Sequence, residues 1–472
     1  MGMSQLFSIG KNYLLLGISL VSMLSILTVI GYRLIYRLIL HGKKAFPLKQ
    51  YIWFVLFFCY IVVVLGATLL ERGEYYDNST IQPLFYSYRL AWYGYACYEW
   101  RNIILNILLF VPLGFWLPFG IRKFRHFYVT YLTGFLFTCS IELTQLFLNK
   151  GIFELDDIMD NTIGAMIGYG FFALWAALRD RIHKRKVSLT GTLAFQLPLF
   201  LTILAFLSLY LCYQKKELGN LSIYPVSRAN VAEVTLADHI TVSEEVVDYM
   251  VYELPRLSIR ETRELAENCF ESLDTTISDT EGDIYAQTAV YKSTGDYEMW
   301  IDYIGGVYHI MDYSYLHPDH LTNPRENATL EELLDALSDY PVTIPRGVTL
   351  ESTKGGSYLL RADKLLIDDI FYDGTFSLFF YDDGRFFDLN NRIYCGTAYK
   401  EFPCISSAQA LDKLRRGEFS HFPQTEALTI TVNRICINYM ADTKGFYQPV
   451  YRFDCIVNGA ETTIRIPALK KH

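Results

Sequence analysis

The sequence predicts an α-helical polytopic membrane domain followed by an α+β extracytoplasmic domain. Of the 472 residues, 51% are hydrophobic, a share too high for an ordinary soluble protein of this length. The long apolar runs lie in residues 1–214, which hold 18 Lys and Arg against 10 Asp and Glu. Residues 215–472 hold 24 basic and 40 acidic side chains, and short apolar runs alternate there with turn signals. We therefore expect a basic membrane domain over 1–214 and an acidic soluble domain over 215–472.

Six apolar segments are long enough to cross a hydrocarbon core of ~30 Å as helices. They lie at about 12–32, 50–70, 102–121, 127–148, 161–178 and 190–213. Lys and Arg gather in the loops after the first, third and fifth of these segments. Because basic loops stay in the cytoplasm, both termini are expected outside, and the C-terminal domain is expected to be extracytoplasmic.

Polar residues interrupt the middle three apolar segments. They are Asn102 and Asn106 in the third and Glu142 and Gln145 in the fourth, whereas Asp156, Asp157 and Asn161 lead into the fifth. Ionisable groups within membrane helices are costly and usually functional. The predicted topology places all of these residues at one depth, in the outer leaflet.

Three small or rigid residues in the same stretch have structural explanations. Gly164 and Gly168 form a small-xxx-small pattern that lets two helices approach closely. Pro112 is expected to kink the third segment and to free a backbone carbonyl that needs a protein partner.

The combined motifs of this stretch resemble the VanZ-like family of bacterial membrane proteins. They read N-I-x-L-F-x-P-L-G-F from Asn106, with Pro112 and Gly114, then I-E-x-x-Q at Glu142 and Gln145, then F-E-L-D-D-I-x-x-N-T-x-G-A-x-x-G through Asn161 and Gly164. The resemblance covers roughly 84–170. Many members carry an Arg before the last motif, where this chain has Gly151 beside Lys150. The resemblance implies a membrane protein of the bacterial envelope associated with resistance to the glycopeptide teicoplanin, with these motif residues as its site.

Each site residue also has a purely structural interpretation. Glu142 is either a ligand-binding or proton-handling carboxylate, or a packing hydrogen-bond partner of Asn106 or Gln145. Asp156 and Asp157 either bind a cation or belong to a solvated outer loop. No cofactor is predicted, and a divalent cation held by Asp156, Asp157 and Glu142 is the one metal alternative. The aromatic loop 71–101 is either a lid over the outer face or an interfacial belt.

The sequence is compatible with three functions. The first is a non-enzymatic envelope protein that binds a lipid-linked or glycopeptide-like ligand from the bilayer. The second is an intramembrane enzyme acting on lipid or cell-wall precursors, although the chain has no G-x-S-x-G, P-loop or H-E-x-x-H motif. The third is a sensor whose extracytoplasmic domain binds a protein partner. The acidic C-terminal part argues against nucleic acid as a partner.

The C-terminal domain shows local helix and turn signals. Ser258, Thr329 and Ser406 are expected helix caps, the last two in capping boxes, and Gly417 is an expected stop. Turns are expected at Gly305-Gly306, Asp373-Gly374 and Asp383-Gly384. Helix followed by antiparallel strands occurs twice, which predicts two repeated halves at about 220–340 and 341–472. This order, with the GFYQPVYRF segment, resembles PepSY-like or YycI-like modules.

Four cysteines of this domain offer two disulfide pairings. Cys436 and Cys455 lie on two expected neighbouring strands, and Cys395 with Cys404 is the alternative pair.

Overall fold

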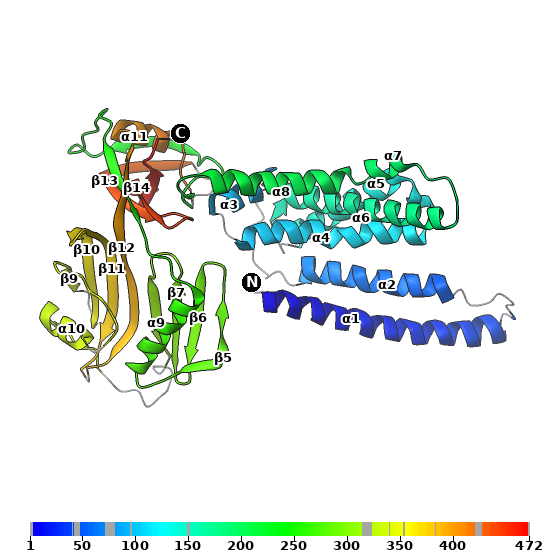
Figure 1. The fold of residues 1–472 in the computed structure, drawn as a ribbon, viewed down its shortest axis with the longest axis horizontal. Helices are drawn as coiled ribbons and strands as arrows, with labels where there is room; N and C mark the ends of the chain where they lie inside the picture. The colour runs from blue at the N-terminus through cyan, green and yellow to red at the C-terminus, as the bar shows by residue number, and fades with distance from the viewer. Residues whose placement is uncertain are drawn as a thin grey trace. The chain divides into compact units, whose positions relative to one another are not determined.

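The structure is a computed structural model, and it describes residues 3–39, 41, 48–70, 81–94, 97–148, 152–313, 323–338, 340–352, 355–382, 384–420 and 427–470. The chain forms two compact units (Figure 1). One consists of Met1–Ala91 with Cys97–Lys215, and the other of Trp92–Ala96 with Lys216–His472. The first is helical and the second is rich in β-sheet, as the sequence predicts.

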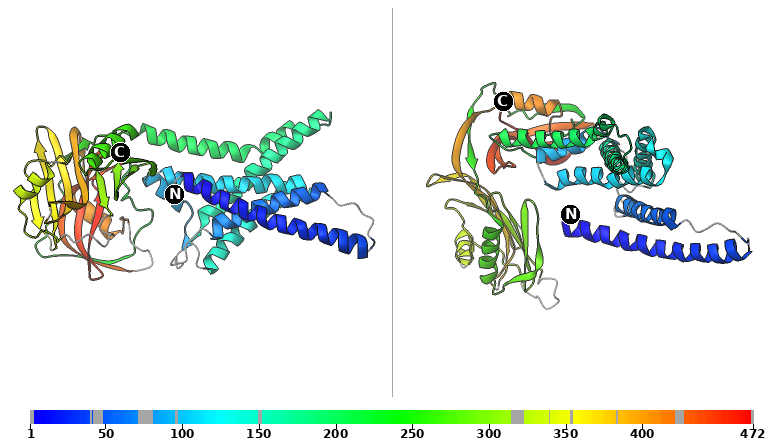
Figure 2. Two further views of the ribbon diagram at one scale, coloured as in Figure 1. Left: turned by 90° about the horizontal axis from the view of Figure 1, so that it is seen from below. Right: turned by 45° about the vertical axis from the view of Figure 1, so that its right-hand side comes forward.

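The first unit is a set of apolar helices with one small strand pair. Its helices are α1 (Met3–Ile30), η1 (Gly31–Ile39), α2 (Leu48–Leu65), η2 (Gly66–Leu70), α3 (Tyr86–Gly94), α4 (Cys97–Gly120), η3 (Arg122–Arg125), α5 (Phe127–Phe147), α6 (Leu155–Ile182), α7 (Leu189–Ala194) and α8 (Leu197–Lys215). The strands β1 (Ile81–Gln82) and β2 (Phe153–Glu154) pair in parallel. Figures 1 and 2 show α1 beside α2, and α4, α5, α6 and α8 gathered as a bundle.

Among the described residues, five helical stretches are long and apolar enough to cross a membrane. They are Tyr13–Arg33, Leu48–Leu69, Glu99–Gly120, Leu155–Ile182 and Leu189–Lys215. The fourth predicted segment forms α5, a helix of 21 residues that is not in this set. Polar side chains lower its apolar character, and Thr138, Glu142 and Gln145 among them are buried. The predicted number of six spans therefore stays a prediction.

The helices of this unit expose large apolar side chains. Met23 of α1, Leu56 of α2 and Phe200 of α8 are examples, with 59%, 48% and 61% of their surface exposed. Exposed apolar surface on this scale is unfavourable in water and favourable in lipid. Together with the five apolar helices, it identifies a membrane protein.

The second unit is built on a large, mostly antiparallel sheet. Its strands are β3 (Val231–Leu236), β4 (Asp248–Glu253), β5 (Ile277–Ile284), β6 (Thr288–Ser293), β7 (Tyr297–Asp302), β8 (Tyr308–Asp312), β9 (Thr349–Ser352), β10 (Ser357–Ile367), β11 (Ile370–Phe380), β12 (Phe386–Pro403), β13 (Leu428–Ala441), β14 (Phe446–Val457) and β15 (Ala460–Pro467). The main path through the sheet runs β3-β13-β14-β4-β12-β8-β7-β6-β5. The long strand β12 pairs with β8 near its start and with β4 near its end.

Within the described residues three helices accompany the sheet, and their expected caps are confirmed. They are α9 (Ile259–Glu271), α10 (Leu330–Leu337) and α11 (Ser407–Arg415). Ser258, Thr329 and Ser406 cap them, each within a complete capping box. Gly417 follows α11 with a φ of +68°, the left-handed conformation that ends helices.

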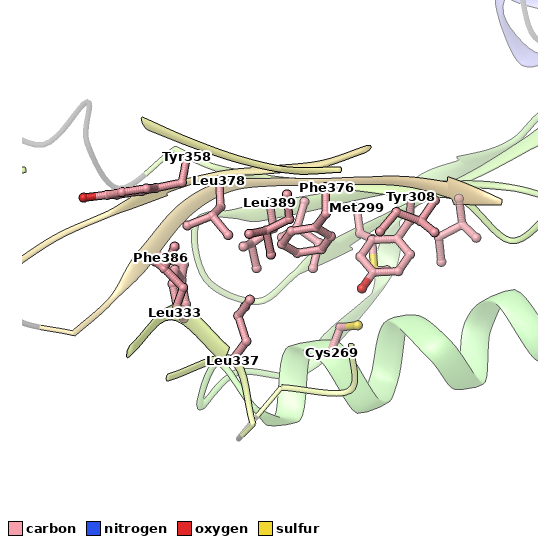
Figure 3. Close-up of a cluster of buried hydrophobic side chains, with 14 of the residues drawn as sticks. Cys269, Met299, Tyr308, Leu333, Leu337, Tyr358, Phe376, Leu378, Phe386 and Leu389 are labelled. Atoms are coloured by element: carbon pink, nitrogen blue, oxygen red, sulfur yellow. The ribbon is translucent and has the colours of Figure 1, made fainter. Parts of the chain in front are cut away.

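The two largest hydrophobic cores among the described residues of this unit are separate from each other. The larger one lies under α9 and α10, and Figure 3 shows Met299, Tyr308 and Phe376 of the sheet near Cys269 and Leu337 of these helices. The smaller one collects side chains of α11, β13, β14 and β15, including Leu414, Ile430 and Phe453. Both cores follow a helix-then-strands order, but the repeat itself stays a prediction.

Of the three predicted turns, one is confirmed and one is wrong. Gly305 and Gly306 form a turn between β7 and β8 with φ of +81° and +61°. Asp373-Gly374 lies inside β11, where Gly374 pairs with Ile393 and a Cβ atom would stand 2.0 Å from the Arg392 carbonyl oxygen. The turn between β10 and β11 is made by Asp368 and Asp369 instead, with φ of +51° and +63°. Asp383 of the third pair lies outside the described residues.

Neither of the two disulfide pairings that the sequence leaves open is formed, because Cys395, Cys404, Cys436 and Cys455 are all free thiols. Cys436 and Cys455 do lie on the paired strands β13 and β14. The register sets Cys436 opposite Arg452 and Cys455 opposite Val432, so the two sulfur atoms are not across from each other. Burial raises the pKa of Cys404 and of Cys455 to about 12, which keeps both as thiols at neutral pH.

Candidate functional site

The start of α6 is where the polar residues of the first unit meet. The helix follows β2 directly and carries Asp156 and Asp157 in its first turn, where acidic side chains interact favourably with the helix dipole. Six residues of the first unit define what we call the polar cluster: Asn106, Glu142, Asp156, Asp157, Asp160 and Asn161. Their hydrogen bonds join α3, α4, α5, α6 and β2 of the same unit.

Asp156 holds the segment that leads into α3. Its two carboxylate oxygens accept hydrogen bonds from the backbone N–H groups of Phe85 and Ser87, the latter at 2.8 Å. Phe85 has a φ of +66°, which turns the chain into the helix. The Ser87 hydroxyl also donates to Glu154 at 3.1 Å. Asp156 is therefore buried in contact with backbone and does not face a solvated loop.

The aromatic loop is described only in part. Residues 71–80 and 95–96 lie outside the described residues, as do Lys150 and Gly151. Residues 81–91 run from β1 into α3 and are joined to the start of α6 by the β1–β2 pair and by Asp156.

Asp157 connects α6 to α4. Its Oδ1 accepts a hydrogen bond from the Asn106 amide nitrogen at 2.6 Å. Asn102, four residues earlier on α4, is exposed and has no described contact with the cluster. The structure thus brings one of the two predicted asparagines into the cluster and not the other.

Glu142 and Gln145 are almost fully buried on α5, each with 1% of its surface exposed. Glu142 accepts a hydrogen bond from the Glu154 backbone N–H at 3.2 Å, so it lies against the residue that precedes α6. Gln145 donates to the Thr68 carbonyl at 2.9 Å. Glu142 therefore belongs to the cluster, whereas Gln145 points to η2.

Asp160 is the cluster member that the sequence prediction missed. It lies one helical turn after Asp156 on α6, and its Oδ1 accepts a hydrogen bond from the Tyr88 hydroxyl of α3 at 2.6 Å. The i, i+4 spacing from Asp156 is a signal that would have placed it on the same face. Asp160 has 1% of its surface exposed, and its second oxygen, Oδ2, is buried with no hydrogen-bond partner in the described structure.

The buried side chain of Asn161 likewise has one bonded and one unsatisfied polar atom. Its amide nitrogen donates to the Thr138 hydroxyl of α5 at 2.9 Å, while its Oδ1 is buried without a partner in the described structure. Buried polar atoms are satisfied in the great majority of native structures. These two oxygens, on consecutive residues of one helix, are therefore the acceptors of the cluster that no described group uses.

Close packing of α4 against α6 supports the cluster. A Cβ on Gly164 would stand 2.0 Å from the Ile107 carbonyl oxygen, and one on Gly114 would stand 1.9 Å from the Ala165 carbonyl oxygen. Gly168 approaches the Val111 carbonyl oxygen in the same way, so the small-xxx-small pattern works as expected. Pro112 lies inside α4, and the nearby Leu109 carbonyl accepts a hydrogen bond from Tyr60 of α2.

The described residues contain no group of three or more His, Cys, Asp or Glu placed to hold a metal ion. Asp156 directs its oxygens at two amides, Asp157 bonds to Asn106, and Glu142 bonds to the Glu154 amide. The three predicted ligands thus contact separate donors, and the geometry provides no argument for a divalent cation.

The second unit has one described cleft, with a volume of about 480 Å³. It lies at the end of β4 and is lined by Glu253, Leu254, Pro255, Arg256, Ile370, Cys395, Gly396 and Thr397. Most of these side chains are exposed or half-buried, and none belongs to the predicted site.

Comparisons with known proteins find two distant structural neighbours and one family match. No curated protein matches the chain. An uncharacterized protein from Eubacterium rectale ATCC 33656 aligns over 51% of this chain and 92% of its own, with 9% identity and a TM-score of 0.27. The Bacillus megaterium YpeB C-terminal domain aligns over 46% of this chain and 100% of its own, with 11% identity and a TM-score of 0.19. At such TM-scores the PepSY-like and YycI-like resemblance stays a prediction.

The membrane unit gives a family match. Residues 53–176 match the model of the VanZ/LLP1 family. This range begins within α2, extends beyond the stretch 84–170 that the motifs indicate, and contains every member of the polar cluster. Residues 53–176 of this membrane protein are therefore similar to the VanZ/LLP1 family, and the match covers this part of the chain only.

Proposed function

We propose that this protein is a non-enzymatic protein of the bacterial cytoplasmic membrane whose polar cluster binds a lipid-linked or glycopeptide-like ligand. By occupying or sequestering that ligand it lowers susceptibility to lipid-anchored glycopeptides such as teicoplanin. The observation that carries the proposal is the pair of buried, unsatisfied oxygens on Asp160 and Asn161. Leaving a buried acceptor unpaired costs roughly 1–3 kcal/mol, so a ligand that donates to it gains binding free energy.

The proposal includes a topology of six spans with both termini outside. It is supported by the basic residues of η3, which precedes α5, and by those at the end of α6. Since α6 crosses the membrane, these two basic segments lie together on the cytoplasmic side only if α5 crosses it as well. The 21 residues of α5 span about 31 Å at the usual rise, enough for the hydrocarbon core. Its buried polar side chains lie inside the bundle, where polar groups are tolerated. In this topology the polar cluster lies in the outer leaflet and the second unit is extracytoplasmic.

The test is teicoplanin susceptibility in a host from which the gene has been deleted. The strain is complemented with the wild type, Glu142→Gln, Asp160→Asn or Asn102→Ala, each at a membrane level verified by immunoblot. Wild type and Asn102→Ala are expected to raise the inhibitory concentration, because Asn102 lies outside the cluster. Glu142→Gln and Asp160→Asn are expected to lose that effect. Retained resistance in both cluster variants at normal protein level would refute the proposal.

Two further measurements separate the alternatives. A chain truncated before residue 218 keeps the resistance effect if the membrane unit carries the function, and loses it if the protein is a sensor acting through its second unit. Turnover of envelope lipid extracts by the purified protein would favour an intramembrane enzyme over a binding protein.

A further inference from the structure

We infer that the ligand of the polar cluster presents a primary ammonium group. Its N–H groups donate hydrogen bonds to Asp160 Oδ2 and to Asn161 Oδ1. This inference rests on the proposed function of the cluster as a binding site, and it names the chemistry of the ligand. It is drawn from the contacts, burial and charge of α6 and its neighbours.

The first step is the state of the two acceptors. Asp160 and Asn161 have 1% and 3% of their surface exposed, and each uses one polar atom within the described structure. The Tyr88 hydroxyl occupies one oxygen of Asp160, and Thr138 engages the amide nitrogen of Asn161. The atoms that remain, Asp160 Oδ2 and Asn161 Oδ1, are both acceptors. A ligand that fits them must therefore be a donor.

The second step is charge. Asp156 and Asp160 lie one turn apart, and within the described structure the groups that donate to them are neutral: two backbone amides and a tyrosine hydroxyl. Asp160 also experiences the negative charges of Asp156 and Glu154. Buried carboxylates without a cation are unfavourable, since like charges repel strongly where water is excluded. A donor that also carries positive charge satisfies the hydrogen bond and offsets this repulsion.

The third step selects the kind of cation. A hard divalent ion wants six or more oxygens, and the described residues hold no metal-binding group of three acidic or His and Cys side chains. A primary ammonium is compact and has three N–H donors. A quaternary ammonium carries the charge but has no N–H to donate, so it cannot satisfy Asp160 Oδ2. The geometry therefore favours the primary amine, whether it belongs to a lipid headgroup or to a free amine.

The experiment measures the thermal unfolding of the full chain in detergent, followed by tryptophan fluorescence, with four additives at equal concentration. These are phosphatidylethanolamine, phosphatidylcholine, phosphatidylglycerol and free ethanolamine. We expect phosphatidylethanolamine to raise the unfolding temperature more than the other two lipids. An equal rise with free ethanolamine assigns a soluble amine as sufficient, and a rise with the lipid alone assigns the headgroup in its membrane context.

Substitutions test which side chains bind the ammonium group. Asp160→Asn keeps the size of the side chain but removes its charge, and it should abolish the difference between phosphatidylethanolamine and phosphatidylcholine. Asn161→Leu should reduce the difference, whereas Thr138→Val, which removes only the partner of the Asn161 amide, should preserve it. A response of Asp160→Asn equal to that of the wild type would overturn the inference.

The wild-type comparison stands even if a variant fails to fold, because equal shifts with phosphatidylethanolamine and phosphatidylcholine would overturn the inference alone. The outcome is also separable from that of the proposed function. Loss of the resistance effect in cluster variants without ammonium selectivity would leave the proposed function standing and reject only the ligand class. Ammonium selectivity without a resistance effect would support the ligand class and reject the proposed role in resistance.

Discussion

The amide nitrogen of Asn106 donates at 2.6 Å to the carboxylate of Asp157, 51 residues later in the sequence, and thereby joins α4 to α6. The next residue on α4, Ile107, directs its carbonyl oxygen at Gly164, two turns after Asp157 on α6. Val111 and Gly168 repeat this close approach one turn further along. The polar bond thus lies at one end of a tightly packed helix pair and fixes where the start of α6 can stand.

Removing this bond should destabilise the membrane unit. Asn106→Leu leaves the Asp157 carboxylate without its Asn106 donor at a site where only 7% of the residue is exposed. The expected cost is about 1–3 kcal/mol, measured by SDS titration of the purified protein. Asn102→Leu is the control, because it changes the same residue type on an exposed position of α4. Equal effects of the two substitutions would show that the bond contributes nothing.

Adding a single methyl group to the α4–α6 contact should have a large effect. Gly164→Ala places a Cβ 2.0 Å from a backbone carbonyl oxygen, so the two helices must separate. Overpacking of this kind costs roughly 1–3 kcal/mol or more. Gly31→Ala is the matched control, since nothing lies within 4 Å of its Cβ position. A lower unfolding temperature for Gly164→Ala with an unchanged one for Gly31→Ala is the expected result.

The six-span topology predicts which positions are reachable from outside the cell. Single cysteines are introduced at Lys123, Leu148 and Arg260 after replacement of the native ones. A membrane-impermeant maleimide should label Leu148→Cys and Arg260→Cys in intact cells, and Lys123→Cys only after permeabilisation. Labelling of Lys123→Cys and Leu148→Cys from the same side would mean that α5 does not cross the membrane.

The second unit should show a pH dependence that stems from Asp373. This carboxylate accepts a hydrogen bond from the Tyr447 hydroxyl at 2.9 Å, and burial raises the pKa of Asp373 above its ordinary value. The folded protein therefore holds this proton more tightly than the unfolded chain does. The resulting stabilisation is fully present below the unfolded pKa of about 3.9 and is lost as pH rises through the raised folded pKa.

Asp373→Asn should remove this part of the pH dependence. The unfolding temperature of the variant at pH 7 is expected to equal or exceed that of the wild type, because no charge is buried. Its unfolding temperature should rise less than that of the wild type as the pH falls from neutral toward the unfolded pKa of about 3.9. Asp412→Asn is the control, as its side chain is 61% exposed and lies on α11, away from Asp373 in β11. Identical pH profiles for wild type and Asp373→Asn would contradict the assignment.

Local signals were enough to predict several elements of the fold. The caps at Ser258, Thr329 and Ser406 involve residues three apart in sequence, so their pattern is visible without tertiary information. The polar residues within apolar segments, taken with the order of those segments, predicted that Asn106, Glu142, Asp157 and Asn161 come to one depth. In the structure Asn106 and Asp157 are hydrogen-bonded to each other.

Contacts between distant segments were not predictable in this way. The bonds of Asp156 to Phe85 and of Asp160 to Tyr88 depend on β1 pairing with β2, about 70 residues away. The pairing of Cys436 depends on an irregularity between Val432 and Arg434 that shifts the register of β13. Asp373-Gly374 resembles a turn, but the glycine is required by the close approach of the Arg392 carbonyl within a strand pair.

The central claim is that the polar cluster binds a ligand, and native mass spectrometry of the full chain released from membranes tests it most directly. Wild type and Asn102→Ala should carry a bound species of defined mass, and Asp160→Asn should lack it, because the oxygen that receives the ligand has become part of a neutral amide. The same bound species on all three proteins, or on none of them, would contradict the claim that Asp160 and Asn161 form a binding site.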